Sequence, residues 1–150
     1  MQQLLSKDDV TRLLETPSDG VRIDTAEKVS LAYSSQTLNA DQRAIAEEVF
    51  RLLVTDQSKA VRESISENLK SSETLPHDLA VKLANDIDDS VAVPMLQCSQ
   101  VLNDEDLIEI VQNMAGERMA AIAGRPQVSE DVSGELLERG DENVAVRLIR

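Results

Sequence analysis

Cys98 and His77 are the two side chains of the sequence that could act as a nucleophile and a base. A cysteine nucleophile needs a base within reach, and a third group usually orients that base. Cys98 lies three residues after Met95 and seven after Val91, so the helical period predicts a buried thiol. His77 lies at an expected helix start, where it is exposed or caps the helix, and no residue at a useful spacing would orient it. We therefore expect no catalytic residues and no enzymatic activity, and an enzyme or sensor that uses Cys98 and His77 is kept as an alternative.

Acidic side chains gather over residues 86–106, where a cation site has to be considered. A calcium loop of the EF-hand type beginning at Asp86 would need glycine at its sixth position and glutamate at its twelfth, and these positions hold Val91 and Gln97. The acidic run at residues 104–106 is typical of a helix N-terminus, where carboxylates interact favourably with the helix dipole. No glycine-rich phosphate loop and no zinc-ligand spacing occurs. The sequence therefore predicts no metal site and no cofactor.

The chain is strongly acidic, with 28 Asp and Glu against 15 Lys and Arg and a formal net charge of -13. This sign of charge repels a phosphate backbone, so we expect no nucleic-acid binding. The excess is greatest over residues 83–117, which contain eight carboxylates and no lysine or arginine. Two interpretations stay open: a solvated acidic face, or a docking surface whose field attracts a basic partner.

Cysteine content and the character of the N-terminus predict a cytoplasmic protein. A single cysteine cannot form a disulfide within the chain, which favours a reducing compartment. The first nine residues lack the basic stretch and the long apolar run of a signal peptide. No segment approaches the roughly 18 consecutive apolar residues of a membrane span, so we expect no membrane association.

Apolar residues recur at steps of three and four along nearly the whole chain, and no alternation of period two persists. This is the period of amphipathic helices, and it predicts an all-α protein of about ten helices. Aromatic residues make up only 1% of the chain, which favours a core of Leu, Val, Ile, Ala and Met. The residues assigned to the core are Val61, Ile65, Leu69, Leu79, Leu83, Val91, Met95, Leu107, Val111, Met119, Ile122, Val132, Leu136 and Leu137.

Helix starts are predicted at polar residues whose side chains can accept from free backbone N–H groups. Some of these residues are followed at the third position by a residue that can reach back, as in a capping box. Proline is tolerated as the first helical residue because its missing N–H would be unpaired there anyway. The predicted starts are Ser6 with Asp9, Asp24 with Glu27, Asn39 with Gln42, then Asn103, Ser129 and Asn143, with Pro76 as a first helical residue.

A short sequence pattern recurs four times. In each copy, an apolar residue precedes a capping residue, which is followed by a short acidic helix. The four copies begin at Leu38, Leu75, Leu102 and Val128, so their spacings are 37, 27 and 26 residues. Repetition at such a period is typical of helical solenoids, in which each helix pair hides its apolar face only by stacking on its neighbours.

A second recurring segment carries a resemblance to a known family. The segment from Asp56 to Arg62, Asp-Gln-Ser-Lys-Ala-Val-Arg, resembles the pattern that opens the first helix of a HEAT repeat. The resemblance implies that Asp56 and Arg62 tie neighbouring repeats together. Pro94 and Ile122 depart from the pattern, because they stand where Arg147 supplies the basic residue. Over nearly the whole chain the sequence is also similar to an uncharacterised alphaproteobacterial family built on HEAT-like helices, which supports the fold and implies no chemistry.

We therefore expect one domain over residues 1–150, an α-solenoid of stacked antiparallel helix pairs like the HEAT and armadillo superhelices. Residues 144–150 are predicted to begin the first helix of a further helix pair, and the second helix of that pair does not follow in the sequence. We therefore expect the chain to be the N-terminal part of a longer protein.

The function expected for such a fold is a protein–protein interaction scaffold or adaptor with an acidic concave face. Its partner would be another protein with a basic surface or helix. The alternative is self-association through the incomplete C-terminal repeat, and the oligomeric state stays open. The residues predicted to bind the partner are Asp78, Lys82, Asp86, Asp104, Asp106, Glu109, Glu135 and Glu138.

Overall fold

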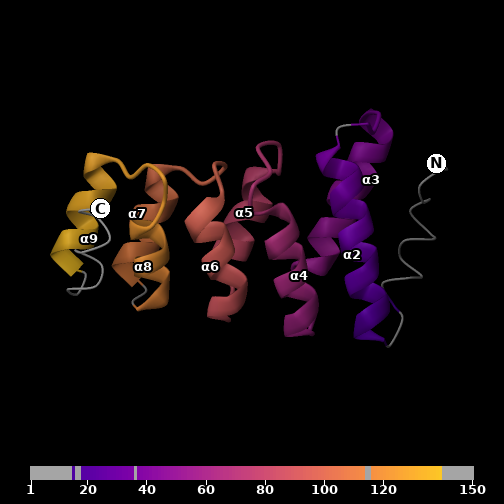
Figure 1. The fold of residues 1–150 in the computed structure, drawn as a ribbon, viewed down its shortest axis with the longest axis horizontal. Helices are drawn as coiled ribbons and strands as arrows, with labels where there is room; N and C mark the ends of the chain where they lie inside the picture. The colour runs from indigo at the N-terminus through magenta and orange to yellow at the C-terminus, as the bar shows by residue number, and fades with distance from the viewer. Residues whose placement is uncertain (1–14, 16–17, 36, 114–115, 140–150) are drawn as a thin grey trace. The chain divides into compact units, whose positions relative to one another are not determined.

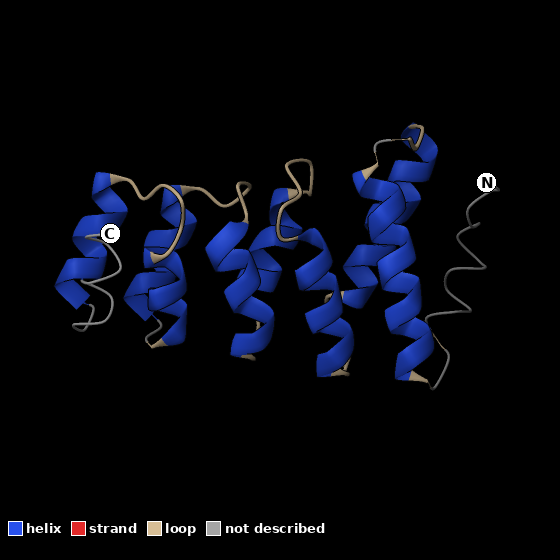
Figure 2. Cartoon of the chain, in the orientation of Figure 1, coloured by secondary structure: helices blue, strands red, loops and turns tan. Residues whose placement is uncertain are grey.

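The computed structural model of the chain describes residues 15, 18–35, 37–113 and 116–139. This part contains eight α-helices and no β-strand (Figure 2). The prediction of an all-α protein is therefore confirmed for these residues. The chain divides into two compact units: unit 1 ends at Leu69, and unit 2 begins at Lys70. No helix in the described ranges combines the length and the apolar character that a membrane crossing requires.

Unit 1 contains α2 (Asp19–Ser34), α3 (Ala40–Leu53) and α4 (Lys59–Leu69) (Figure 1). α2 packs along α4, and it also contacts α3. Apolar side chains of these three helices are withdrawn from solvent, and their burial is what holds three short helices together. They are Ala26, Val29, Tyr33, Ala46, Val49, Phe50, Leu53, Val61, Ile65 and Leu69.

The two aromatic residues of the chain, Tyr33 and Phe50, meet in the core of unit 1. Their rings pack edge to face with centroids 5.1 Å apart, so that the positive edge of one ring meets the negative face of the other. The Tyr33 hydroxyl donates a 2.8 Å hydrogen bond to Glu47 Oε2. The guanidinium carbon of Arg43 lies 4.6 Å from the centroid of the Tyr33 ring. Tyr33 is therefore buried with its polar atom satisfied, and it fixes α2 against α3.

Unit 2 contains α5 (His77–Ala84), α6 (Asp89–Cys98), α7 (Asp104–Asn113), α8 (Glu117–Ala123) and α9 (Glu130–Arg139) (Figure 1). α6 packs beside α8, and α7 packs beside α9. α8 contacts both α7 and α9, and α5 packs on α6. Within this unit, α6 and α8 therefore lie in one layer, and α7 and α9 lie in a second layer against it.

Three of the predicted caps are confirmed. The Asn39 side chain accepts from the backbone N–H of Gln42, and the Gln42 side chain accepts from the backbone N–H of Asn39, which is a complete capping box. Asn103 and Asp106 make the same reciprocal pair at the start of α7, with both hydrogen bonds 2.9 Å long. Ser129 Oγ accepts from the N–H three residues later at the start of α9. These side chains satisfy backbone groups that the helix itself leaves unpaired.

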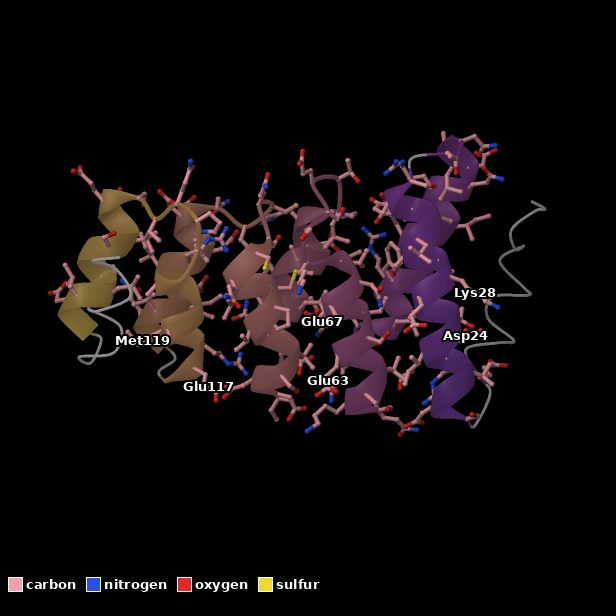
Figure 3. All side chains as sticks on the ribbon, in the orientation of Figure 1. Asp24, Lys28, Glu63, Glu67, Glu117 and Met119 are labelled. Atoms are coloured by element: carbon pink, nitrogen blue, oxygen red, sulfur yellow. The ribbon has the colours of Figure 1, made fainter. Side chains whose placement is uncertain are left out.

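Two of the predicted starts are wrong. Asp24 lies inside α2, which begins at Asp19, and its carboxylate forms an exposed 3.1 Å ion pair with Lys28 one turn later (Figure 3). A capping-box spacing is also the spacing of neighbours on one helix face, so the two cases share one sequence pattern. Pro76 lies one position before the first residue of α5 rather than at that residue. The starts predicted at Ser6 and Asn143 lie outside the described residues.

The predicted core is confirmed with one exception, Leu137. All the other assigned residues are buried, whereas Leu137 is 60% exposed. α9 buries Val132 and Leu136, which lie on one face because they are four residues apart. The next residue is rotated by about 100° and leaves that face. The Leu-Leu pair gave no local indication of which leucine is turned inward.

Cys98 is half-buried rather than fully buried. Val91 and Met95, which share its side of α6, have no exposed surface. Cys98 is the last residue of α6. The predicted position on the apolar stripe is therefore right, but the predicted full burial is wrong.

Candidate functional site

The residues predicted to bind a partner all lie in unit 2, but they do not form one uniform surface. Their positions are set by the same helices that build the core, because each amphipathic helix turns one stripe inward and leaves the opposite side exposed. Asp78 and Lys82 lie on α5, Asp86 follows α5, Asp104, Asp106 and Glu109 lie on α7, and Glu135 and Glu138 lie on α9.

The exposed side of α7 carries two carboxylates one turn apart. The helix buries Leu107, Ile110 and Val111, and this stripe leaves Glu105 and Glu109 exposed. Neither of the two glutamate side chains makes a hydrogen bond or an ion pair with another described residue. Glu109 was among the residues predicted to bind a partner, and Glu105 was not. The spacing of four residues between the two glutamates is the signal that could have found it.

α5 presents a different charge pattern on its exposed side. Asp78 and Lys82 are both exposed and lie four residues apart, so a carboxylate and an ammonium group share one side of the helix. The opposite side of α5 is buried through Leu79 and Leu83. The unbalanced negative charge is therefore centred on α7 rather than spread evenly over both helices.

On α9 the predicted residues divide into one that faces α7 and one that faces solvent. Glu135 is half-buried and accepts a 3.4 Å hydrogen bond from Gln112 Nε2 of α7. Glu138 is exposed, and so is Glu130 at the helix start, which the sequence prediction omitted. Glu135 therefore helps to join the two helices, and Glu130 and Glu138 are the carboxylates of α9 that solvent reaches.

Asp106 and Asp86 are used to hold the backbone and neighbouring helices in place. The Asp106 side chain is only 15% exposed, and its Oδ2 accepts from the Asn103 N–H and lies 2.7 Å from His77 Nε2. This contact joins the start of α7 to the start of α5, and His77 is exposed at a helix start as predicted. Asp86 Oδ1 accepts from the backbone N–H of Asp88 and so shapes the turn into α6. Both carboxylates have structural partners within unit 2.

Arg118 is turned into the interior of unit 2. Its side chain is 5% exposed, and its Nε donates a 2.7 Å hydrogen bond to Asp89 Oδ1 at the start of α6. Its Nη1 also donates to the Ala84 carbonyl at 3.5 Å. A buried guanidinium is stable only if such acceptors replace water. This cation therefore joins α8 to α6 and to the end of α5.

Arg125 is used in a similar way. Its Nη1 donates to the Leu96 carbonyl at 2.6 Å, and its Nη2 donates to the Ser99 carbonyl at 2.5 Å. The Leu96 carbonyl belongs to the last turn of α6 and the Ser99 carbonyl to the residue that follows the helix, where carbonyls lack partners within the helix. Desolvation lowers the pKa of Arg125 from its ordinary value, and the nearby Cys98 and Asp104 oppose this shift. The guanidinium therefore acts as a cap for the end of α6.

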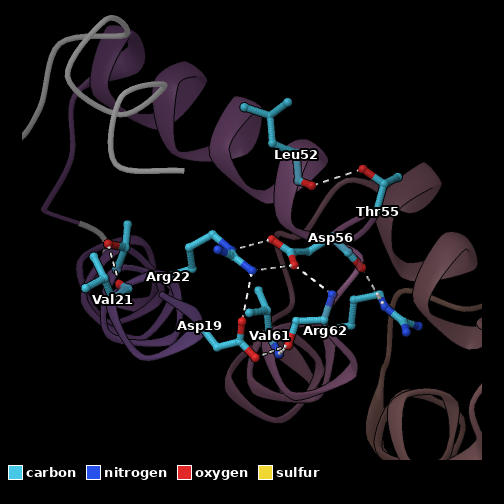
Figure 4. Close-up of polar contacts among 10 residues, drawn as sticks. Asp19, Val21, Arg22, Leu52, Thr55, Asp56, Val61 and Arg62 are labelled. Carbon is cyan, nitrogen blue, oxygen red and sulfur yellow. Dashed lines mark hydrogen bonds and ion pairs between the residues drawn. The ribbon is translucent and has the colours of Figure 1, made fainter. Parts of the chain in front are cut away.

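The segment that resembles a HEAT repeat lies in unit 1, where Asp56 is the centre of a polar network (Figure 4). Asp56 Oδ2 accepts from Arg22 Nε at 2.8 Å, and its Oδ1 accepts from Arg22 Nη2 at 3.2 Å. The Ser58 N–H also donates to Asp56 Oδ1 at 2.8 Å. The hydrogen bond to Asp56 raises the pKa of Arg22, which is buried on α2. The network therefore ties α2 to the turn that precedes α4.

The same network extends to two further side chains (Figure 4). Asp19 accepts from Arg22 Nη2 at 3.2 Å and from Ser58 Oγ at 2.9 Å. Arg62 Nε donates to the backbone carbonyl of Asp56 at 2.9 Å. Asp56 therefore contacts another helix through Arg22, whereas the Arg62 contact stays within its own segment, and the role in joining neighbouring repeats that the resemblance implied stays a prediction. No local pattern in the sequence identified Arg22, because its partner lies 34 residues away.

The two residues that could do nucleophilic chemistry are not joined to each other. The His77 ring forms a hydrogen bond with the Asp106 carboxylate. In the part of the chain that the structure describes, no hydrogen bond links the Cys98 thiol to the His77 ring. Within the same residues, no three carboxylate, imidazole or thiol groups are close enough to hold a metal ion together.

Comparison with known protein families found a similarity over the last part of the chain. Residues 91–150 are similar to a family described as "Uncharacterised protein conserved in bacteria (DUF2336)". The match includes α7, α8 and α9. It is shorter than the nearly complete coverage that we expected for the alphaproteobacterial family. No curated protein and no solved structure matches the chain.

Proposed function

We propose that this chain is a non-catalytic scaffold or adaptor, and that the exposed side of α5, α7 and α9 binds a basic segment of another protein. The observation that carries the proposal is the Glu105 and Glu109 pair on α7. Both side chains are exposed, and neither has a partner among the described residues. Two carboxylates one turn apart project from the same side of a helix, so they can contact two cationic groups of one partner together.

The hydrogen-bond partners of two arginines in unit 2 support this proposal. Arg118 and Arg125 donate to acceptors within the unit, and neither forms an ion pair with Glu105 or Glu109. A field of one sign accelerates the approach of an oppositely charged partner and disfavours partners of like charge. It contributes more to association rate and to selectivity than to affinity. We therefore expect binding that weakens strongly as salt is added.

We also propose that α5 to α9 follow the plan of HEAT-like repeats. The two layers of unit 2 and the repeated polar caps at the starts of α7 and α9 support this plan. In such a plan, equivalent helices of successive repeats line one continuous wall. The carboxylates of α7 and α9 would then follow one another along that wall, which suits an extended or helical basic segment.

The proposal is tested with the complete chain immobilised and exposed to a bacterial lysate, with bound proteins identified by mass spectrometry. The test variant carries Glu105→Gln and Glu109→Gln. Each exposed ion pair contributes about 0.2–1 kcal/mol, so loss of two predicts about a 2- to 30-fold weaker binding. The affinity of the identified partner is measured by titration calorimetry at low and at high salt.

The matched control is Glu63→Gln with Glu67→Gln on α4, a pair with the same spacing of four residues on a different helix (Figure 3). It removes the same formal charge, so it changes the net charge of the chain equally. Far-ultraviolet circular dichroism confirms that each variant is folded. The proposal requires that the α7 variant loses affinity and that the α4 variant keeps it. Equal losses would mean that net charge alone attracts the partner, and unchanged binding by both variants would remove α7 from the interface.

A further inference from the structure

We draw no further inference here: the strongest candidate, the exposed apolar side chain of Leu137 on the outer side of α9, is a single residue on an unpartnered helix face, and nothing in the described part of the structure shows what covers it.

Discussion

The adjacent leucines of α9 provide a sharp test of the packing described for unit 2. Leu136 has no exposed surface, whereas Leu137 is 60% exposed. Their chemistry, their helix and their distance from the chain end are almost the same. Replacement of each by alanine therefore isolates the effect of burial. We expect Leu136→Ala to destabilise the protein strongly and Leu137→Ala to do so only slightly.

The expected free energies follow from the exposed fractions. A fully buried leucine replaced by alanine costs about 2–5 kcal/mol, because the apolar transfer energy is lost and a cavity remains. Complete burial of a leucine side chain is worth about 1.5–3 kcal/mol, and Leu137 withdraws only about two-fifths of its surface, so its loss costs at most about 0.6–1.2 kcal/mol. Alanine also has the higher helix propensity, which offsets part of this smaller loss.

The measurement is urea unfolding of the complete chain followed by circular dichroism at the helical minimum. Each variant is compared with the unchanged chain at the same protein concentration, and the shift of the midpoint is converted with the measured slope. A Leu137→Ala variant that loses as much stability as Leu136→Ala would show that Leu137 is covered in solution. That result would refute the burial that the structure assigns to this face of α9.

The remaining predictions concern polar contacts, and urea unfolding measures each of them. Asn103→Ala removes the capping box of α7 and is expected to cost about 1 kcal/mol; no shift would mean that water caps the helix equally well. Asp56→Asn removes the charge of the closer of the two carboxylates that bind the buried Arg22 and should lower the midpoint clearly, whereas the control Asp24→Asn breaks an exposed pair and should leave it nearly unchanged. Arg125→Lys replaces a planar group that reaches two carbonyls with a point charge, so a loss of about 1–2 kcal/mol is expected, and an unchanged midpoint would exclude a capping role.

Local sequence patterns predicted the helices and most of the core of this chain. The period of three and four residues identified the buried stripes of α4 through α9, since side chains at this spacing must share a helix face. The same period could not choose between Leu136 and Leu137, because their neighbouring helices decide which of them is covered. Asp24 shows that the prediction of helix starts is also limited. A polar pair three residues apart occurs both at helix starts and on helix surfaces, so the pattern alone could not distinguish the two.

The residues predicted to bind a partner stay a prediction, and the sequence did not show which of their carboxylates have structural partners. The acidic composition of residues 83–117 pointed to α7, but it did not separate Glu109, which is exposed, from Asp106, which is held by Asn103 and His77. The difference arises from a contact between residues 29 positions apart. Arg118 shows the same limit, because its acceptor on Asp89 is equally remote in the sequence. Such partners follow from the stacking of helices and leave no local trace in the residue pattern.

The position of Tyr33 makes unit 1 visible by optical methods that do not detect unit 2. The chain contains one tyrosine, one phenylalanine and no tryptophan, and both aromatic residues lie in unit 1. Intrinsic fluorescence and the near-ultraviolet dichroism of the ring therefore follow the loss of tertiary structure in unit 1 alone. The far-ultraviolet signal follows the helices of both units. Recording both signals in one unfolding experiment would show whether the two units lose their structure in one step or in two.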